Sequence, residues 1–344
     1  MTHPLALLTD PHLLDEVLRL AAAADCPLSC APDVPALRLS WHFAPLVVLD
    51  AAALPACVAA DLPRRPGVVV VHGGDPPWPL VVAVGAAALL ELPTEAEALV
   101  TLLTDVRDGP PSDAGRVLSV IGGRGGAGAS VLATACARES ATTGTETLLV
   151  DCDPLGGGLD LTLGAESATG ARWPSVHCSG GRVPMSSLRA ALPTTGALSV
   201  LSCDRTAEPP EPQAVSAVLD AARRSGCTTV CDLPRHPTPA ATAALSRTDL
   251  AVLVVPAELR ATAAATRVAT LLRTHGTPTR LVVRGPSPSG LSAPDIAAAV
   301  GLPLLTQMRP EPGLPAALDR GHLPRNPKGP LATTARLILQ SLHP

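Results

Sequence analysis

The stretch VLSVIGGRGGAGASVLATACA (Val117–Ala137) decides which fold this chain of 344 residues can adopt. An apolar run of strand length leads into a glycine-rich turn, and an alanine-rich segment of helical character follows the turn. A strand, a glycine turn and a helix in this order can form a phosphate-binding loop, because the N–H groups of the turn and of the helix N-terminus attract an anion. From Gly123 onward the residues match the pattern GxxxxGK[ST], except that Ala129 stands in place of the lysine.

Carboxylates follow the loop at the ends of two later apolar runs. The run LLVDCD ends in Asp151 and Asp153, and the run TTVCD ends in Asp232. Because the carboxyl ends of parallel strands meet at one edge of a sheet, we expect these side chains to lie beside the loop. Ser130 stands where a hydroxyl would bind Mg²⁺, which prefers a few carboxylate and hydroxyl oxygens together with water. A glycine turn alone would indicate no more than a tight connection, but the carboxylates in this order favour a site for phosphate and Mg²⁺.

Strand and helix patterns alternate along almost the whole chain, which predicts parallel sheets flanked by helices. The segment RDGPPSDAG, rich in Pro, Gly and Asp, interrupts the alternation and predicts a linker. We therefore expect one α/β domain over residues 1–106, a linker over 107–115 and a doubly wound domain with six or seven strands over 116–344. The expected strands are 5–10, 46–50, 67–74 and 86–93 in the first domain and 116–122, 146–153, 197–204, 228–234, 250–257, 279–285 and 303–309 in the second.

The composition excludes several classes of function. A net charge of −4 and an aromatic content of 1% provide neither the basic surface nor the stacking platforms of a general nucleic-acid binder. No apolar run approaches the roughly 20 residues of a membrane-spanning helix, and the first residues lack the basic start of a secretory signal. We therefore expect a cytoplasmic protein. The nine cysteines have no metal-binding spacing, which favours buried thiols over a zinc site.

Several motifs together resemble those of a known family. The loop GGRGGAGAS is similar to the deviant loop KGGxGK[ST] of ParA/MinD-type P-loop ATPases. With DCDPLGGGLDLTLGAE, RWP, VPAELRA, LVVRGP and RPEPGLPAALDRG, it resembles more narrowly the actinobacterial CpaE-like, septum-site-determining proteins. The resemblance covers nearly the whole chain. It implies a regulator that acts through proteins of the division septum or of a pilus or secretion apparatus, forms a homodimer and is recruited to the membrane by its partners.

The resemblance also implies roles for individual residues. Arg124 replaces the lysine that reaches across a nucleotide-sandwiched dimer, and Ala129 replaces the lysine that contacts the β- and γ-phosphates, a loss of about 1.5–3 kcal/mol of binding. Asp153 would position the attacking water, and Arg284 stands where the family places an adenine-reading asparagine. The implied site for ATP or ADP comprises Gly123, Arg124, Gly125, Gly126, Ala127, Gly128, Ala129, Ser130 and Arg284, with Ser130, Asp151 and Asp232 at Mg²⁺ and with Asp153 and Arg124 as catalytic candidates.

The first domain resembles a response-regulator receiver, an α/β domain of the flavodoxin type. Asp50 ends the run LVVLD, where the phosphoacceptor would stand, and Asp10 would be one of the acidic pair. Thr9 replaces the other acid, and Leu92 precedes Pro93 where a lysine is expected. Without that acid and that lysine, Mg²⁺ capture and phosphoryl stabilisation are compromised. The interpretation is a pseudo-receiver that serves in docking.

Three functional hypotheses remain open on the sequence. The first is a MinD/CpaE-like spatial regulator that binds ATP or ADP weakly and hydrolyses it slowly or not at all. The second is a non-enzymatic scaffold with a vestigial nucleotide site. The third is an active ATPase in which Arg124 substitutes for the missing lysine. We also expect Trp173 to be a packing anchor and the tail from Pro330 to be a core helix docked on the domain.

Overall fold

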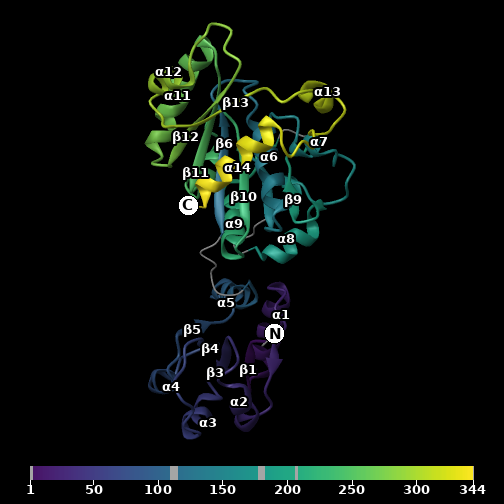
Figure 1. Cartoon of the computed structure of the whole chain (residues 1–344). Helices are drawn as coiled ribbons and strands as arrows, with labels where there is room; N and C mark the ends of the chain where they lie inside the picture. The colour runs from purple at the N-terminus through teal and green to yellow at the C-terminus, as the bar shows by residue number, and fades with distance from the viewer. Residues whose placement is uncertain (1–2, 109–114, 177–182, 206–207, 344) are drawn as a thin grey trace. The chain divides into compact units, whose positions relative to one another are not determined.

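The computed structural model describes residues 3–108, 115–176, 183–205 and 208–343. Contacts divide the chain into two compact units, one formed by the residues up to 110 and one formed by most of the chain from residue 111 onward. In Figure 1 the first unit is coloured from purple to blue and the second unit from teal through green to yellow. Most of the predicted linker lies outside the described residues, so the boundaries at residues 106 and 116 stay a proposal.

The first unit is built on a five-stranded parallel sheet with the order β2-β1-β3-β4-β5. This is the strand order of flavodoxin-like folds, as predicted. The strands are β1 (Leu5–Leu7), β2 (Ser29–Cys30), β3 (Val47–Asp50), β4 (Val68–His72) and β5 (Ala88–Glu91), and the helices are α1 (Pro11–Ala23), α2 (Val34–Ser40), α3 (Leu54–Ala59), α4 (Trp78–Val84) and α5 (Ala96–Asp108).

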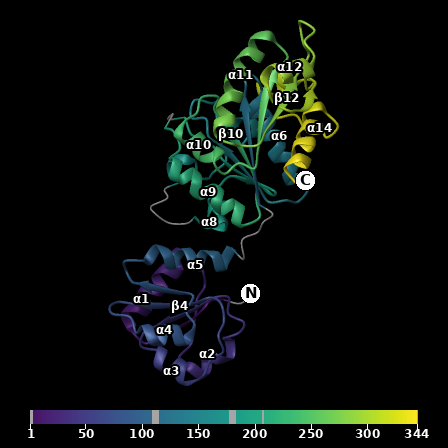
Figure 2. The same cartoon turned by 90° about the vertical axis from the view of Figure 1, so that its left-hand side faces the viewer.

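Helices cover both faces of this sheet. Helices α1 and α5 pack together on one face, and α2, α3 and α4 cover the other (Figure 2). The central strands β3 and β4 are buried along their whole length because each faces a layer of helices on both sides. The apolar runs found in the sequence are therefore the core of the unit.

Asp50 at the end of β3 holds the first unit together at the carboxyl edge of the sheet. Its side chain is fully buried and accepts hydrogen bonds from the backbone N–H of Thr9, from that of Asp10 at 2.7 Å and from that of Ala53 at 2.8 Å. The Thr9 hydroxyl adds a contact of 3.0 Å. Asp10 in turn caps α1 by accepting from the N–H of His12 at 2.8 Å. The chain itself therefore satisfies the carboxylate that a working receiver would offer to a phosphoryl group.

The second unit contains an eight-stranded sheet with the order β13-β12-β11-β6-β10-β7-β9-β8. All neighbours are parallel except β8, which pairs antiparallel with β9. The strands are β6 (Arg116–Gly122), β7 (Thr147–Asp151), β8 (Thr194–Thr195), β9 (Leu198–Leu201), β10 (Thr228–Leu233), β11 (Leu250–Pro256), β12 (Thr279–Arg284) and β13 (Leu304–Met308). The helices are α6 (Ala129–Thr142), α7 (Leu159–Leu163), α8 (Met185–Ala191), α9 (Pro212–Arg224), α10 (Pro239–Leu245), α11 (Leu259–Thr274), α12 (Ala293–Val300), α13 (Leu314–Leu318) and α14 (Pro330–Leu342).

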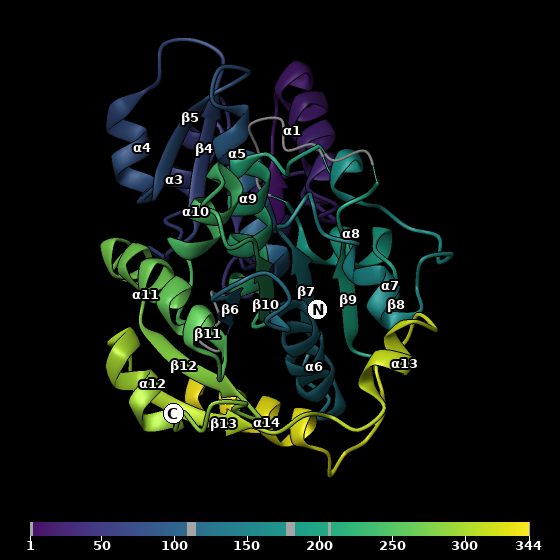
Figure 3. The same ribbon diagram turned by 90° about the horizontal axis from the view of Figure 1, so that it is seen from above.

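The sheet of the second unit is doubly wound, which confirms the predicted fold class. Helices α6, α7 and α14 lie on one face, and α9, α10, α11 and α12 lie on the other (Figure 3). Helix α14 packs along α6 and against β13, with Leu331, Ala335 and Ile338 buried, so the tail is a docked core helix as predicted. The predicted strands recur at similar positions, and the two-residue edge strand β8 is an addition that periodicity could not indicate.

Replacing Asp50 with Ala is expected to loosen the first unit locally. The substitution leaves three backbone N–H groups without their acceptor, and for the buried N–H of Ala53 the loss costs about 1–3 kcal/mol. Hydrogen exchange of the amides in β1 and β3 measures the effect, with Asp50→Asn as the matched variant that keeps one acceptor oxygen. Unchanged exchange in Asp50→Ala would show that these hydrogen bonds do not hold the carboxyl edge of the sheet together.

Candidate functional site

The glycine-rich loop lies between the end of β6 at Gly122 and the start of α6 at Ala129. Gly126 and Gly128 have φ angles of +70° and +95°, which side chains other than glycine adopt at a cost. A Cβ on Gly123 would approach the Ala265 Cβ and a Val255 methyl carbon to 2.9 Å. Backbone conformation and close packing therefore both demand the glycines that the sequence has.

The loop presents unbonded backbone donors. Among the described residues, the N–H groups of Gly125, Gly126, Gly128, Ala129 and Ser130 have no hydrogen-bond acceptor. A Cβ on Gly125 or Gly126 would meet no atom within 4 Å, so the space beside the loop is open. Ala127 differs, because its N–H lies 3.4 Å from the carbonyl oxygen of Arg124 and its side chain is buried. An anion with several oxygens, such as a phosphate group, fits the free donors of this cradle.

The carboxylates predicted to lie beside the loop do so. Asp151 and Asp232 are register partners on the adjacent strands β7 and β10, and both are buried, at 2% and 4% exposure. The Ser130 hydroxyl at the start of α6 donates a hydrogen bond to Asp232. The charge of Asp153 acts on both buried carboxylates. The structure thus brings Ser130, Asp151, Asp153 and Asp232 together at the loop.

Burial makes both carboxylates hold a proton more tightly than in water. It raises the pKa of Asp151 from 3.8 to about 6, although hydrogen bonds from the backbone N–H groups of Asp153, Cys203 and Leu159 oppose the rise. Burial also raises the pKa of Asp232 well above its ordinary value, and the hydrogen bond from Ser130 offsets part of the rise. The charges of Asp151 and Asp153 raise the pKa of Asp232 further. A cation at this position would relieve the same repulsion.

A polar layer behind Asp151 was not predicted from the sequence. Ser202 donates to Asp151 at 3.3 Å, and the N–H of Leu159 reaches both Ser202 at 3.0 Å and Asp151 at 3.2 Å. The indole of Trp173 donates to the backbone carbonyl of Asp151 at 2.6 Å. Trp173 is buried, at 4% exposure, so the prediction that it is a packing anchor is confirmed.

Asp160 is a buried acid that was not predicted from the sequence. It is 1% exposed and forms ion pairs with Arg172 at 3.1 Å and with Arg205 at 3.2 Å. Ser202 links it to Asp151 at distances of 3.5 and 3.3 Å. The only signal in the sequence was a further aspartate at the end of the motif DCDPLGGGLD. This paired acid fixes the start of α7, from which Leu159 reaches Asp151.

Two arginines flank the loop. Arg124 forms an ion pair with Glu258, with Nη2 lying 2.9 and 3.0 Å from the two carboxylate oxygens. The Arg284 Nη1 lies 3.2 Å from the position that a Cβ on Gly128 would occupy. Burial lowers the pKa of Arg284, the charge of Arg124 lowers it further, and Glu258 opposes the change. Arg284 therefore lies against the loop next to Ala129, whereas Arg124 is turned to Glu258.

The carboxylates do not form a ready-made metal cage. Within the described ranges, no group of three or more His, Cys, Asp or Glu residues is arranged to hold a metal ion. Mg²⁺ nevertheless suits the residues present, because it keeps several waters and takes ligands from substrate phosphates. Ser130, Asp151 and Asp232 would then hold it through a hydroxyl, carboxylates and water. Their roles, like those of Asp153 and the loop residues, stay predictions.

Comparison with known proteins places the chain in a family. Over 339 residues it is 44% identical to the uncharacterized protein Rv3660c of Mycobacterium tuberculosis (strain ATCC 25618 / H37Rv), with 97% of this chain and 96% of the relative covered. The chain belongs to the Rv3660c-like family. Protein MT3760 of Mycobacterium tuberculosis (strain CDC 1551 / Oshkosh) matches to the same extent. Residues 7–114 match the family model described as "Rv3660c-like, CheY-like N-terminal domain".

Solved structures identify the fold of the second unit of this Rv3660c-like chain. A ParA family ATPase from Chlorobium tepidum TLS has a TM-score of 0.58 at 18% identity and covers 65% of this chain and 97% of its own. The cell division ATPase MinD of Pyrococcus furiosus has a TM-score of 0.57 at 19% identity, over 66% of this chain and 99% of its own. MinD from Pyrococcus horikoshii OT3, complexed with Mg-ADP, has a TM-score of 0.55 at 17% identity, over 66% and 95%. The fold is thus that of ParA/MinD ATPases, preceded by a CheY-like domain.

Other predicted features agree with the structure in part. Seven of the eight cysteines among the described residues are buried, as the sequence favoured. Among the described helices, none has the length and apolar character needed to cross a membrane.

The raised pKa of Asp151 predicts a pH dependence of stability. The folded chain binds this proton more tightly than the unfolded chain, so the contribution is fully present below about pH 4 and is lost as the pH rises through about 6. Asp151→Asn has no ionisable group at this position, so its free energy of unfolding should not fall in this way. The difference in the free energy of unfolding between variant and parent should therefore change by about 2–3 kcal/mol between pH 4 and pH 7. Hydrogen exchange of the β7 amides without Mg²⁺ or nucleotide measures it.

The surface variant Glu166→Gln serves as the control for the loss of one carboxylate. Its exchange should follow the parent at every pH. Identical pH profiles for the parent and Asp151→Asn would contradict the burial of an ionisable Asp151.

Proposed function

We propose that the second unit binds a magnesium nucleotide, ATP or ADP, weakly through its lysine-free loop. The convergence of free loop amides with Ser130, Asp151 and Asp232 carries the proposal. The amide N–H groups would donate hydrogen bonds to phosphate oxygens, and the carboxylates and the hydroxyl would hold a Mg²⁺ ion bound to those phosphates. One structure of this fold, MinD from Pyrococcus horikoshii OT3 complexed with Mg-ADP, supports this ligand class.

The missing lysine determines what the site can do. Without a cation at residue 129, binding loses about 1.5–3 kcal/mol, and developing charge during phosphoryl transfer is less stabilised. The Arg284 guanidinium lies beside this place, with Nη1 3.2 Å from the position that a Cβ on Gly128 would occupy. Asp153 remains available to position a water at the same edge. Weak binding with slow or no hydrolysis follows from these residues.

Two alternative functions, a non-enzymatic scaffold and an active ATPase, each have a specific observation or test that bears on them. A non-enzymatic scaffold is favoured by Ala129 and by the pairing of Arg124 with Glu258, which withholds Arg124 from the loop. An active ATPase with Arg124 as the substitute requires that ion pair to break, because Arg124 would have to turn from Glu258 to the phosphates. Turnover that Asp153→Ala abolishes would support this alternative.

At the level of the cell, we propose a MinD/CpaE-like spatial regulator of septum-site selection or of the assembly of a pilus or secretion apparatus. The chain would act in the cytoplasm through protein partners that recruit it to the membrane, and it would form a homodimer. Leu155 and Leu259 are 86% and 72% exposed next to Asp153 and Glu258, and such apolar side chains beside the site suit a protein interface. Among proteins of this fold, MinD of Aquifex aeolicus forms a MinC:MinD cell division protein complex.

Restoring the lysine tests the loop directly. Ala129→Lys is expected to tighten Mg–ATP binding by about ten- to a hundredfold, because it adds a charge-assisted contact to the phosphates. Calorimetric titration of the full chain with Mg–ATP and Mg–ADP measures the affinity, and phosphate release measures turnover. No binding by the parent at millimolar nucleotide would leave the scaffold as the surviving alternative. Equal affinity of parent and variant would mean that the loop does not hold phosphate.

A second substitution tests the cation beside the loop. Arg284→Gln is expected to weaken Mg–ADP binding by about tenfold, because it removes the guanidinium that lies against Gly128, next to Ala129. Arg280→Gln is the matched control, since Arg280 is an exposed arginine on the same strand, β12. A loss that is equally large in Arg280→Gln would assign the effect to overall charge instead of to the site.

A further inference from the structure

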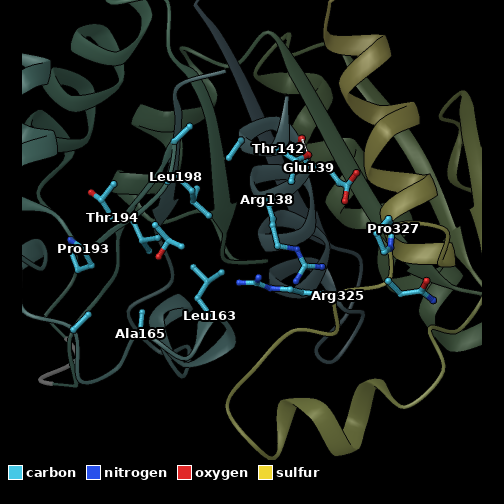
Figure 4. A pocket seen from close by; sticks show the side chains of 17 residues that line it. Arg138, Glu139, Thr142, Leu163, Ala165, Pro193, Thr194, Leu198, Arg325 and Pro327 are labelled. Atoms are coloured by element: carbon cyan, nitrogen blue, oxygen red, sulfur yellow. Dashed lines mark hydrogen bonds between the residues drawn. The ribbon is translucent and has the colours of Figure 1, made fainter. Parts of the chain in front are cut away.

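A separate cavity of about 360 Å³ lies in the second unit, away from the glycine-rich loop. Its walls come from the last turn of α6, from α7, from the β8–β9 hairpin and from the segment around Arg325 (Figure 4). The loop is at the opposite end of α6, and a helix of 14 residues spans about 21 Å. The cavity is therefore a second place for a ligand, and its size is that of a small-molecule site.

One side of the cavity is apolar. Leu163 from α7 and Leu198 and Val200 from β9 form this wall, and Ala141 and Ala165 extend it. In Figure 4, Leu163 and Leu198 face the cavity opposite Arg138. A hydrocarbon body suits this wall, because burial of apolar surface is favourable by about 25 cal/mol per Å². A highly charged group such as a nucleotide phosphate would leave the same wall unused.

The other side carries two cations. Arg138 on α6 and Arg325 both line this side of the cavity, and their side chains are drawn near one another in Figure 4. Burial lowers the pKa of Arg138, and the charge of Arg325 lowers it further, while Glu139 and Glu311 oppose the change. Two like charges in one partly buried place repel each other, and an anion between them would remove that repulsion.

The nearby acids are already engaged. Glu139 forms an ion pair with Arg336 at 3.0 Å. Glu311 accepts from the Asn326 amide at 3.0 Å and from the N–H of Leu331 at 2.9 Å. Within the part of the chain that the structure describes, Arg325 has neither a hydrogen bond nor an ion pair. An unpaired guanidinium thus remains at the mouth of an apolar cavity.

The rim that carries Arg325 is fixed by its neighbours. Arg138 donates to the carbonyl oxygens of Leu323 at 3.0 Å and Pro324 at 2.6 Å. The bond from Asn326 to Glu311 holds the chain on the far side of Arg325. These contacts fix the Arg138 guanidinium and the backbone on both sides of Arg325, which reduces the entropy lost when a ligand binds.

We propose that this cavity binds a small apolar carboxylate, with its hydrocarbon body against Leu163, Leu198 and Val200 and its carboxylate between Arg138 and Arg325. Guanidinium groups bind carboxylates through paired hydrogen bonds, so both ends of such a ligand find a matching surface. The proposal stands independently of nucleotide binding, because none of these residues belongs to the loop.

Calorimetry of the full chain without nucleotide tests the proposal, with octanoate as the probe and with octanol and octylamine as ligands of the same chain length. Octanoate should bind at least tenfold more tightly than octanol, and octylamine should not bind. Arg325→Gln should weaken octanoate binding by about three- to tenfold. Arg320→Gln, on an exposed arginine of the preceding segment outside the cavity, should leave it unchanged.

A second variant distinguishes binding in the cavity from attraction of octanoate to positive charge at the surface. Ala168→Trp places a large side chain at the cavity lining and should abolish octanoate binding while Arg325 stays in place. Equal binding of octanoate and octanol, or octanoate affinity that neither variant changes, would overturn the proposal.

Discussion

Two carboxylates that are buried side by side set the main constraint on the structure of the second unit. Asp151 and Asp232 end adjacent parallel strands, and among the described residues no lysine or arginine forms an ion pair with either of them. Burying charge in this way is unfavourable unless hydrogen bonds or a cation compensate for the lost water. Backbone N–H groups supply part of the compensation to Asp151, and the Ser130 hydroxyl supplies part of it to Asp232. The turns after β7 and the start of α6 are arranged around this requirement.

Neither unit has a lysine where the sequence analysis expected one, since Leu92 and Ala129 occupy those positions, but the two sites differ. In the first unit, Asp50 is satisfied by the chain's own N–H groups, so its carboxylate is closed to an incoming group. In the second unit, the loop amides keep no internal acceptor and face open space. The site at Asp50 is therefore closed by hydrogen bonds from its own chain, whereas the glycine-rich loop of the second unit is open to an anion.

The sequence was sufficient for features that depend on local pattern. Apolar runs predicted the central strands of both sheets, and the order of strand ends predicted that Asp151 and Asp232 would meet beside Ser130. It was insufficient where the contact joins distant parts of the chain. The ion pair between Arg124 and Glu258 spans 134 positions, and no local pattern indicates it.

The buried Asp160 with its two arginines was also beyond local pattern, since its partners stand 12 and 45 positions away. Likewise, the absence of a lysine at residue 129 is visible in the sequence, whereas the approach of Arg284 to Gly128 requires the register of β12 beside β11. Strands of two residues, such as β2 and β8, are too short for periodicity to indicate.

The edge strand β8 has a consequence for how copies of the chain can meet. A long parallel sheet offers rows of free N–H and C=O groups at its margin, and such margins promote aggregation between molecules. Here the margin is a strand of two threonines that turns back on β9 after Pro193, a residue without an N–H. This margin is a poor template for sheet extension, whereas the opposite margin of the same sheet is β13, a parallel strand of five residues.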